Sequence, residues 1–335
     1  MVRHEMDERR TGTRLAVAAL LLLALVQVPT PARPQEIRLG QVGINLVEIP
    51  TYVAMEKGFF AERGLRVNFQ HFESDTIIIK AFVAGDIQVA FLGSSAAILA
   101  SSKGVKLKAF VSGAPVHDYV IVAQTPIKAY PDLPGKNFAV SGVGAISYHL
   151  PRVAIRQKGV DPDRINYVAV GTDGARLRAL IAKKVDATIL HVHNAIRARD
   201  YAHLHIMSNL VQELPLFVFI YGIAKPDYLN ANPAQAARLV RVMIETSRFV
   251  YQNKRETVEV AAKVLKMDEK YLSPTYDLLK EAKVWGVNGG LDDKGYDFTA
   301  RFLASTGELK QPVPADEFFD RRFVSQALRE LGTWP

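Results

Sequence analysis

The feature that most constrains the fold is an internal repeat, because residues 74–98 recur ninety-eight positions later as residues 172–196. Each copy predicts the same elements in the same order: a helix N-cap (Ser74 or Thr172), an apolar-periodic helix, a polar turn and an apolar strand. Chance similarity between alanine-rich helices is the alternative, but the matched order favours a duplicated α/β unit. The identical aligned pairs are Asp75/Asp173, Ala81/Ala179, Ala84/Ala182, Leu92/Leu190, Ala97/Ala195 and Ile98/Ile196.

The strand of each copy ends in small or polar residues where a further helix should begin. Open α/β sheets bind ligands at such edges, beyond the carboxyl ends of their strands. The repeat therefore predicts two similar lobes whose ligand-facing loops meet across a gap.

Strands and helices alternate on both sides of the repeat, which favours parallel βαβ units. The apolar segment 214–224 has no counterpart in the repeat and is interpreted as the return of the chain to the first lobe. The predicted fold class is α/β, a two-lobed type II periplasmic-binding arrangement of two βα sheets joined by two crossings, with a helical carboxyl-terminal tail packed on the first lobe. We assign residues 1–32 to a signal peptide, 36–114 plus 224–335 to lobe 1, and 115–223 to lobe 2. The predicted strands include 37–42, 65–72, 105–111, 118–124, 137–141 and 165–170, and the predicted helices include 49–63, 146–158, 233–252, 255–265, 268–283, 293–305 and 315–331.

The amino-terminal residues predict export. Four arginines precede an uncharged apolar run, residues 15–28, and prolines and Ala32 follow it. This order is typical of a cleaved secretory signal; a membrane span needs about 20 apolar residues, which leaves an uncleaved anchor as the alternative. The sequence has no cysteine, so neither disulfides nor a lipid-bearing amino-terminal cysteine can form. We expect a protein secreted into a bacterial periplasm.

The charge of the chain argues against nucleic-acid binding. The formal net charge is +8, but the lysines and arginines are spread along the sequence rather than interleaved with aromatic residues in one patch. The charge is compatible with an anionic ligand or an acidic partner surface.

Several short motifs carry a resemblance to a known family. They resemble motifs of nitrate/sulfonate/taurine-type periplasmic solute-binding proteins of the NMT1/THI5-like superfamily, although Gln88 stands where the family usually has aspartate. The resemblance implies a hinged protein without catalysis or cofactor, and a monomer. Such a protein closes on a small organic anion or an aromatic or heterocyclic molecule (sulfonate, carboxylate or pyrimidine-like) and delivers it to the permease and ATPase of an ABC importer in the membrane. The matching segments are 52–60 (YVAMEKGFF), 64–67 (GLRV), 85–90 (GDIQVA), 132–136 (DLPGK) and 159–162 (GVDP).

Candidate ligand contacts follow from the predicted strand-to-helix edges. Ser94 and Ser95 lead, because hydroxyls at such an edge can donate to a carboxylate, sulfonate or amide; a helix cap is the alternative role. Asp75 and Asp173 are expected to cap their helices, since a carboxylate would repel an anion. The candidates are Asn45, Ser74, Thr76, Gly93, Ser94 and Ser95 in the first lobe, His117 and Tyr119 at the crossing, and Ser141, Gly144, Ala145, Ile146, Ser147, Thr172, His191 and His193 in the second.

Three other interpretations of these loops stay open. Residues 142–147 (GVGAIS) come close to a dinucleotide fingerprint, but no acidic residue ends the next strand, so a nest of backbone amides for an anion is the better account. His191 and His193 could bind a metal, yet no third ligand with fixed spacing accompanies them. No arginine falls inside the candidate loops, which favours a monoanionic or largely neutral, aromatic ligand.

Two rival functions also remain. An enzyme on the same fold would resemble pyrimidine-synthase proteins, whose cysteine-rich motif this sequence cannot form. A sensor domain would pass ligand-driven closure to a membrane receptor instead of a permease.

Overall fold

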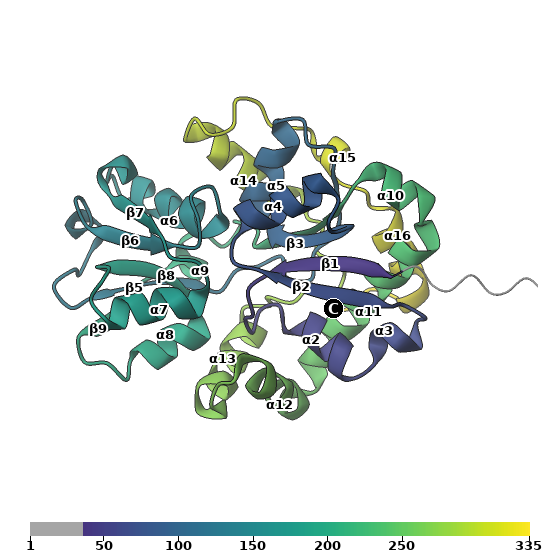
Figure 1. Cartoon of the computed structure of the whole chain (residues 1–335), viewed down its shortest axis with the longest axis horizontal. Helices are drawn as coiled ribbons and strands as arrows, with labels where there is room; N and C mark the ends of the chain where they lie inside the picture. Colours follow the sequence, from purple (N-terminus) through teal and green to yellow (C-terminus); the bar gives the residue numbers. More distant parts are fainter. Residues whose placement is uncertain (1–35) are drawn as a thin grey trace, which may run out of the picture. The chain divides into compact units, whose positions relative to one another are not determined.

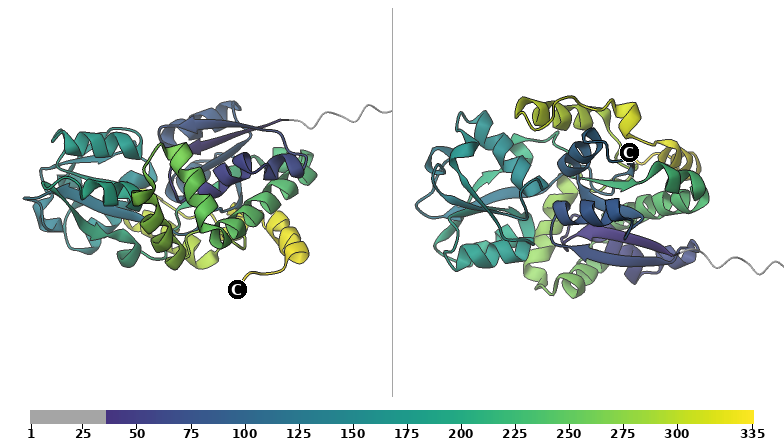
Figure 2. Two further views of the ribbon diagram at one scale, coloured as in Figure 1. Left: turned by 90° about the horizontal axis from the view of Figure 1, so that it is seen from below. Right: turned by 45° about the horizontal axis from the view of Figure 1, so that its top comes forward.

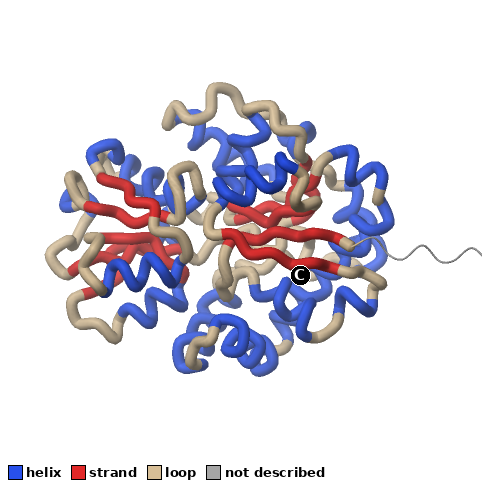
Figure 3. Tube along the Cα trace, viewed as in Figure 1, coloured by secondary structure: helices blue, strands red, loops and turns tan. Residues whose placement is uncertain are grey.

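The computed structural model describes residues 36–335, so the predicted signal peptide lies outside the described residues. Two five-stranded sheets, red in Figure 3, have the strand orders β2-β1-β3-β10-β4 and β7-β6-β8-β5-β9. The first contains β1 (Ile37–Val42), β2 (Val67–Phe72), β3 (Val89–Gly93), β4 (Lys108–Val111) and β10 (Ile220–Ala224). The second contains β5 (Tyr119–Gln124), β6 (Asn137–Val140), β7 (Asn166–Ala169), β8 (Ala187–His191) and β9 (Leu204–Asn209).

The two sheets have one topology. In the first sheet β1 pairs in parallel with β2 and β3, whereas β10 runs antiparallel between β3 and β4. In the second sheet β6 pairs in parallel with β7 and β8, whereas β5 runs antiparallel between β8 and β9. The repeat strands β3 and β8 therefore take equivalent places, which confirms the predicted two-lobed α/β fold.

The two antiparallel strands are also equivalent, since β5 and β10 are the first strands that follow the two crossings between the lobes. The segment 214–224 therefore does have a structural counterpart, although the sequence repeat does not reveal it. Only its second half is a strand. Residues 114–117 and 214–219 form the two crossings, where Phe219 N–H donates to Pro115 O (3.0 Å) and Ile220 N–H donates to Ala114 O (3.3 Å).

Two helices predicted as continuous are broken. The helix predicted for residues 49–63 stops at the end of α2, because Gly58 has φ +80°, a left-handed conformation that does not fit within an α-helix. The helix predicted for residues 315–331 is interrupted at Phe319, which forms an isolated β-bridge with Ala109 of the first sheet. The helices are α2 (Ile49–Glu56), α3 (Phe59–Glu62), α4 (Asp75–Ala84), α5 (Ser94–Ser102), α6 (Ile146–Gln157), α7 (Asp173–Ile181), α8 (Val192–Ala198), α9 (Leu210–Glu213), α10 (Pro226–Ala231), α11 (Pro233–Gln252), α12 (Lys254–Leu265), α13 (Glu269–Glu281), α14 (Asp293–Ser305), α15 (Ala315–Phe318) and α16 (Arg322–Leu331).

The sequence patterns do not predict strand β9 or helix α9. In β9 only Leu204 and Ser208 are buried, so successive residues of this strand do not alternate between buried and exposed. Its place at the edge of the second sheet explains this, because an edge strand packs less of its surface.

Each sheet lies between two layers of side chains. Along β3, Val89 and Phe91 face one hydrophobic cluster and Ala90 and Leu92 face another, as expected for the period of two in a strand. The helices of Figure 1 supply the outer layers. The sheets are thus covered on both faces, and only their strand ends are left for a ligand.

The carboxyl-terminal tail packs on the first lobe as predicted, and it also reaches the second. Helices α11 and α12 contact α2, while α13 contacts α8 of the second lobe. The Tyr271 hydroxyl of α13 donates to Asp200 just beyond α8. Beyond α14, Glu308 lies 2.6 Å from the His149 ring of α6. Figure 2 shows the tail from two further sides.

Candidate functional site

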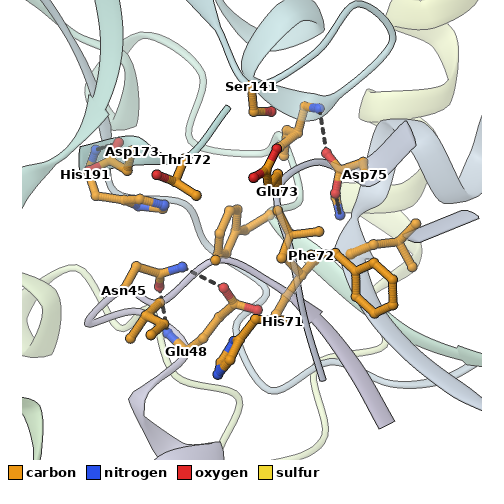
Figure 4. Close-up of a pocket in the computed structure, with 18 of the residues that line it drawn as sticks. Asn45, Glu48, His71, Phe72, Glu73, Asp75, Ser141, Thr172, Asp173 and His191 are labelled. Atoms are coloured by element: carbon orange, nitrogen blue, oxygen red, sulfur yellow. Dashed lines mark hydrogen bonds between the residues drawn. The ribbon is translucent and has the colours of Figure 1, made fainter. Parts of the chain in front are cut away.

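A cavity of about 330 Å³, the cleft cavity, lies where the strands of both sheets end. Val42, Phe72 and Gly93 close β1, β2 and β3, and all three line it. The second lobe contributes Ser141, just after β6, and His191, the last residue of β8. Its volume is at the lower end of the range for small-molecule sites, about 300–1,000 Å³. Figure 4 shows its lining side chains.

The cavity brings together part of the predicted set. The predicted residues that line it are Asn45, Gly93, Tyr119, Ser141, Ile146, Thr172 and His191. The predicted residues outside its lining are Ser74, Thr76, Ser94, Ser95, His117, Gly144, Ala145, Ser147 and His193.

The structure corrects the expectation for the two serines. The Ser94 hydroxyl is fully buried and donates to Val218 O (2.5 Å), so it holds α5 against the return crossing. Ser95 is also fully buried, and its hydroxyl has no partner among the described residues. Neither serine is among the residues that line the cleft cavity.

The other predicted residues outside the lining have structural partners. The Thr76 hydroxyl donates to Val143 O across the lobes (3.0 Å), and the Ser147 hydroxyl accepts from Ser141 N–H (2.8 Å). The His117 ring bonds to Leu214 O (3.1 Å) at the crossing, and burial lowers its pKa to about 4. His193 is buried, and its ring stacks on His191 at 5.8 Å. The side chain of Ser74 does not cap α4, and Gly144 and Ala145 lie just before α6.

Asp75 and Asp173 do not cap their own helices. Asp75 Oδ1 accepts from Gly93 N–H (2.8 Å), and Asp173 Oδ1 accepts from His191 N–H (3.1 Å). These two bonds join equivalent positions of the repeat, since each ties the start of a helix to the end of the next strand. Thr172 is the cap of α7, where its hydroxyl accepts from Ala175 N–H (3.4 Å).

Asp75 also joins the two lobes. Its second oxygen, Oδ2, accepts from Ile146 N–H at the start of α6 in the other lobe (2.8 Å). Beside this bond, a Cβ added to Gly93 would lie 2.7 Å from the Ile146 Cβ. Glycine is therefore required at position 93 for the lobes to approach this closely.

His191 lies at the centre of a group of rings, with Tyr119 and Phe219, that lines the cavity. Its Nδ1 lies 2.5 Å from Asp118 Oδ1, and both residues are buried. Burial lowers the pKa of His191, but the Asp118 carboxylate outweighs this effect and the pKa is raised overall. The Tyr119 ring stacks on His191 at 4.3 Å, and Phe219 lies edge-on to both. No hydrogen bond of Nε2 is found within residues 36–335, so this nitrogen is available to a ligand.

Glu48 is the functional candidate that the sequence pattern missed. It lines the cavity and is 4% exposed, and Asn45 Nδ2 donates to its Oε2 (2.5 Å). Its Oε1 has no partner among the described residues. Burial raises the pKa of Glu48 well above its ordinary value, and the nearby Asp75 and Asp118 raise it further, against the Asn45 hydrogen bond. The signal in the sequence was an acidic residue three positions after Asn45, just before a helix.

Arg176 was placed beyond the candidate loops, yet it lines the cavity. Side chains near the start of a helix lean toward its amino terminus, which carries this guanidinium back to the strand edge. It donates to Gly171 O (2.7 Å), Ile189 O (3.0 Å) and Asp173 Oδ1 (2.8 Å). The cavity thus contains an arginine whose charge is already paired.

Residues 36–335 show neither a cluster of metal ligands nor a helix suited to the membrane. No group of three or more histidine, cysteine or acidic side chains is placed to hold a metal ion. None of the described helices is both long and apolar enough to cross a membrane.

Comparison with known proteins identifies the family. The model of the family described as NMT1/THI5 like matches residues 45–257. The chain belongs to the NMT1/THI5-like family. Its match contains the cavity-lining residues of both lobes from Asn45 to Ile220.

Relatives of the NMT1/THI5-like chain are binding proteins. One from Brucella abortus, named only as a binding protein, is 25% identical over 312 residues, which cover 89% of this chain and 94% of the relative. The formylaminopyrimidine-binding protein of Halalkalibacterium halodurans is 22% identical, over 90% of this chain and 95% of its own. These names agree with the expectation of a protein that binds rather than catalyses.

Solved structures share the fold. The alkanesulfonate-binding protein of Xanthomonas axonopodis pv. citri, bound to MOPS, superposes with a TM-score of 0.71 at 15% identity, over 87% of this chain and 99% of its own. At this identity the likeness establishes the periplasmic-binding-protein fold and leaves the ligand open. The family, the names of the relatives and the fold agree with a protein that binds a solute.

Proposed function

We propose that the mature protein works in the periplasm, where it captures a small organic solute in the cleft cavity and delivers it to an ABC permease. The observation that carries the proposal is the lobe-spanning bond from Ile146 N–H to Asp75 Oδ2 (2.8 Å) beside a cavity lined by both lobes. A ligand that contacts both lobes favours the closed arrangement, because it binds that arrangement better than the open one. Closure is the signal that a permease can read.

The residues proposed to meet the solute are those that line the cleft cavity. From the first lobe they include Asn45, Glu48 and Phe72; from the second and its crossing, Tyr119 and His191. Residues 114–117 and 214–219 are proposed as the hinge, since within residues 36–335 the chain passes from one sheet to the other there. We propose a monomer, because one chain supplies both walls of the cavity.

The proposal is tested by screening residues 36–335 for thermal stabilisation against a broad solute library, followed by calorimetry. A ligand at a hundred times its Kd should raise the free energy of unfolding by about 2.7 kcal/mol. Ligand-dependent transport by vesicles containing the cognate permease should then require the protein. Failure of every solute in the library, or turnover of a bound solute by the pure protein, would contradict the proposal.

A further inference from the structure

The further inference concerns the chemical class of the solute, and it rests on the proposed function. Around the cleft cavity, carboxylates of the protein already bind four backbone amides at the strand-to-helix edges, and one buried oxygen of the Glu48 carboxyl has no hydrogen-bond partner among the described residues.

The backbone amides at the strand-to-helix edges are the natural anion sites of this fold. Asp75 occupies two of them, Gly93 N–H (2.8 Å) and Ile146 N–H (2.8 Å). Asp118 occupies Val192 N–H (3.1 Å) at the start of α8, and Asp173 occupies His191 N–H (3.1 Å). Within the predicted amide nest at residues 142–147, the Ile146 N–H is thus already bound by Asp75.

The charges around the cavity point the same way. Glu48, Glu73, Asp75 and Asp173 line it, whereas its one arginine, Arg176, is paired with Asp173 at 2.8 Å. No lysine is among the described lining residues. His191, whose pKa is raised, is likewise paired with Asp118 at 2.5 Å. A sulfonate, carboxylate or nitrate would therefore enter next to several carboxyl groups, and the lining arginine and His191 are each already paired with a carboxylate.

Glu48 Oε1 is the acceptor that remains. The side chain is 4% exposed, so the oxygen is removed from bulk water, and no donor among the described residues reaches it. A buried polar atom without a hydrogen bond costs free energy that a donor on the ligand would recover. In Figure 4 the Glu48 carboxyl stands among the lining side chains, next to Asn45.

The rest of the lining fits a flat molecule. Tyr119, His191 and Phe219 present ring surfaces to the cavity, with Phe72 on the side of the first lobe. His191 Nε2 has no partner within residues 36–335, so it can hydrogen-bond a ligand atom at the second-lobe wall. Aromatic faces and a lone acceptor together describe an aromatic ring that carries an amino, amidine or amide N–H.

We propose that the cleft cavity selects a planar, neutral or cationic nitrogen compound that donates an N–H to Glu48 Oε1, and that it discriminates against anions. Within the set of ligands expected from the sequence, this places amino-substituted heterocycles ahead of sulfonates and carboxylates.

The test uses three probes of one shape and different charge: benzamidine (cation), benzamide (neutral) and benzoate (anion), titrated calorimetrically into residues 36–335. Benzamidine and benzamide are expected to bind at least tenfold more tightly than benzoate. Cytosine is expected to bind in the same class as benzamide. Benzoate binding as tightly as the other two would overturn the inference, and so would the absence of binding by all four probes.

The variant Glu48→Gln keeps the shape of the side chain but cannot ionise, so it cannot form the anion that a cationic ligand would stabilise. It should cut the preference for benzamidine over benzoate by about tenfold, whereas the matched change Glu62→Gln on exposed α3, far from the lining, should leave it unaltered. The wild-type probe order stands as evidence even if Glu48→Gln folds poorly. If the solute library yields sulfonates that bind wild type and Glu48→Gln alike, the ligand class is wrong while the proposed function stands. If the library yields no ligand, the proposed function fails.

Discussion

Replacing Gly93 by alanine should prevent the lobes from reaching the observed arrangement. The new Cβ would lie 2.7 Å from the Ile146 Cβ, whereas carbon atoms in contact are about 3.5–4.0 Å apart. The lobes must therefore separate by about 1 Å at this point. The first lobe can accept the change, since Gly93 has φ −54°, a conformation open to alanine, and the second close atom is the Asp75 carboxylate oxygen at the end of a side chain.

The magnitude follows from the bond that is lost. A separation of about 1 Å stretches the 2.8 Å bond from Ile146 N–H to Asp75 Oδ2 beyond hydrogen-bonding distance. A hydrogen bond to a charged group contributes about 1.5–3 kcal/mol, so the closed state should lose that amount relative to the open state. Since about 1.4 kcal/mol corresponds to tenfold in affinity, ligand binding should weaken by roughly 10- to 150-fold.

Calorimetry with the tightest ligand of the library measures the loss, and small-angle X-ray scattering measures closure. Ligand should reduce the radius of gyration of wild type and leave that of Gly93→Ala unchanged. The double variant Gly93→Ala with Ile146→Gly removes the clashing carbon and should recover part of the affinity, which a double-mutant cycle quantifies. Wild-type affinity and normal compaction in Gly93→Ala would refute the reasoning, because the contact would then play no part in the bound form.

Three further predictions concern buried polar groups. In urea denaturation, Glu48→Gln should stabilise the unliganded protein more at pH 8 than at pH 5. The reason is that the pKa of Glu48 is raised in the folded state, so the wild-type protein loses stability as pH rises through that pKa. An equal effect of the substitution at both pH values would contradict this. Asp118→Asn should bring the pKa of His191 below its ordinary value, because burial then acts without the opposing carboxylate; an unchanged NMR titration of the ring would exclude the ion pair. Ser94→Val should lower the melting temperature of the unliganded protein by several degrees, since about 1–3 kcal/mol is lost when the buried Val218 carbonyl has no donor; an unchanged melting temperature would show that the bond contributes nothing.

The architecture could be predicted from the sequence because it depends on periodicity and on a repeat. Strand β1 and helices α11 and α14 have the predicted bounds, and the repeat strands β3 and β8 lie at equivalent places in the two sheets. The errors fall where one residue decides the outcome. Gly58 ends α2 through its left-handed conformation, and Phe319 leaves a helical pattern to pair with Ala109.

The candidate site was harder to predict because side-chain direction decides it. The cavity lies at the expected strand edges, but Ser94 and Ser95 are buried outside its lining while Arg176 lines it. Asp75 looked like a helix cap because sequence spacing shows only neighbours along the chain. Its partners are Gly93 N–H at the end of the next strand and Ile146 N–H in the other lobe, and no pattern within one element can reveal such contacts.

The tail has a consequence for how quickly a solute can leave. Helix α13 is fixed to the first lobe through α12 and touches α8 of the second, and Glu308 reaches His149. The tail therefore adds two noncovalent contacts between the lobes to the hydrogen bonds of Asp75 and Thr76 and to the covalent crossings. Separation of the lobes must either break these contacts or drag the tail along, so residence time in the cavity depends on residues such as Tyr271 and Glu308 that never touch the cargo.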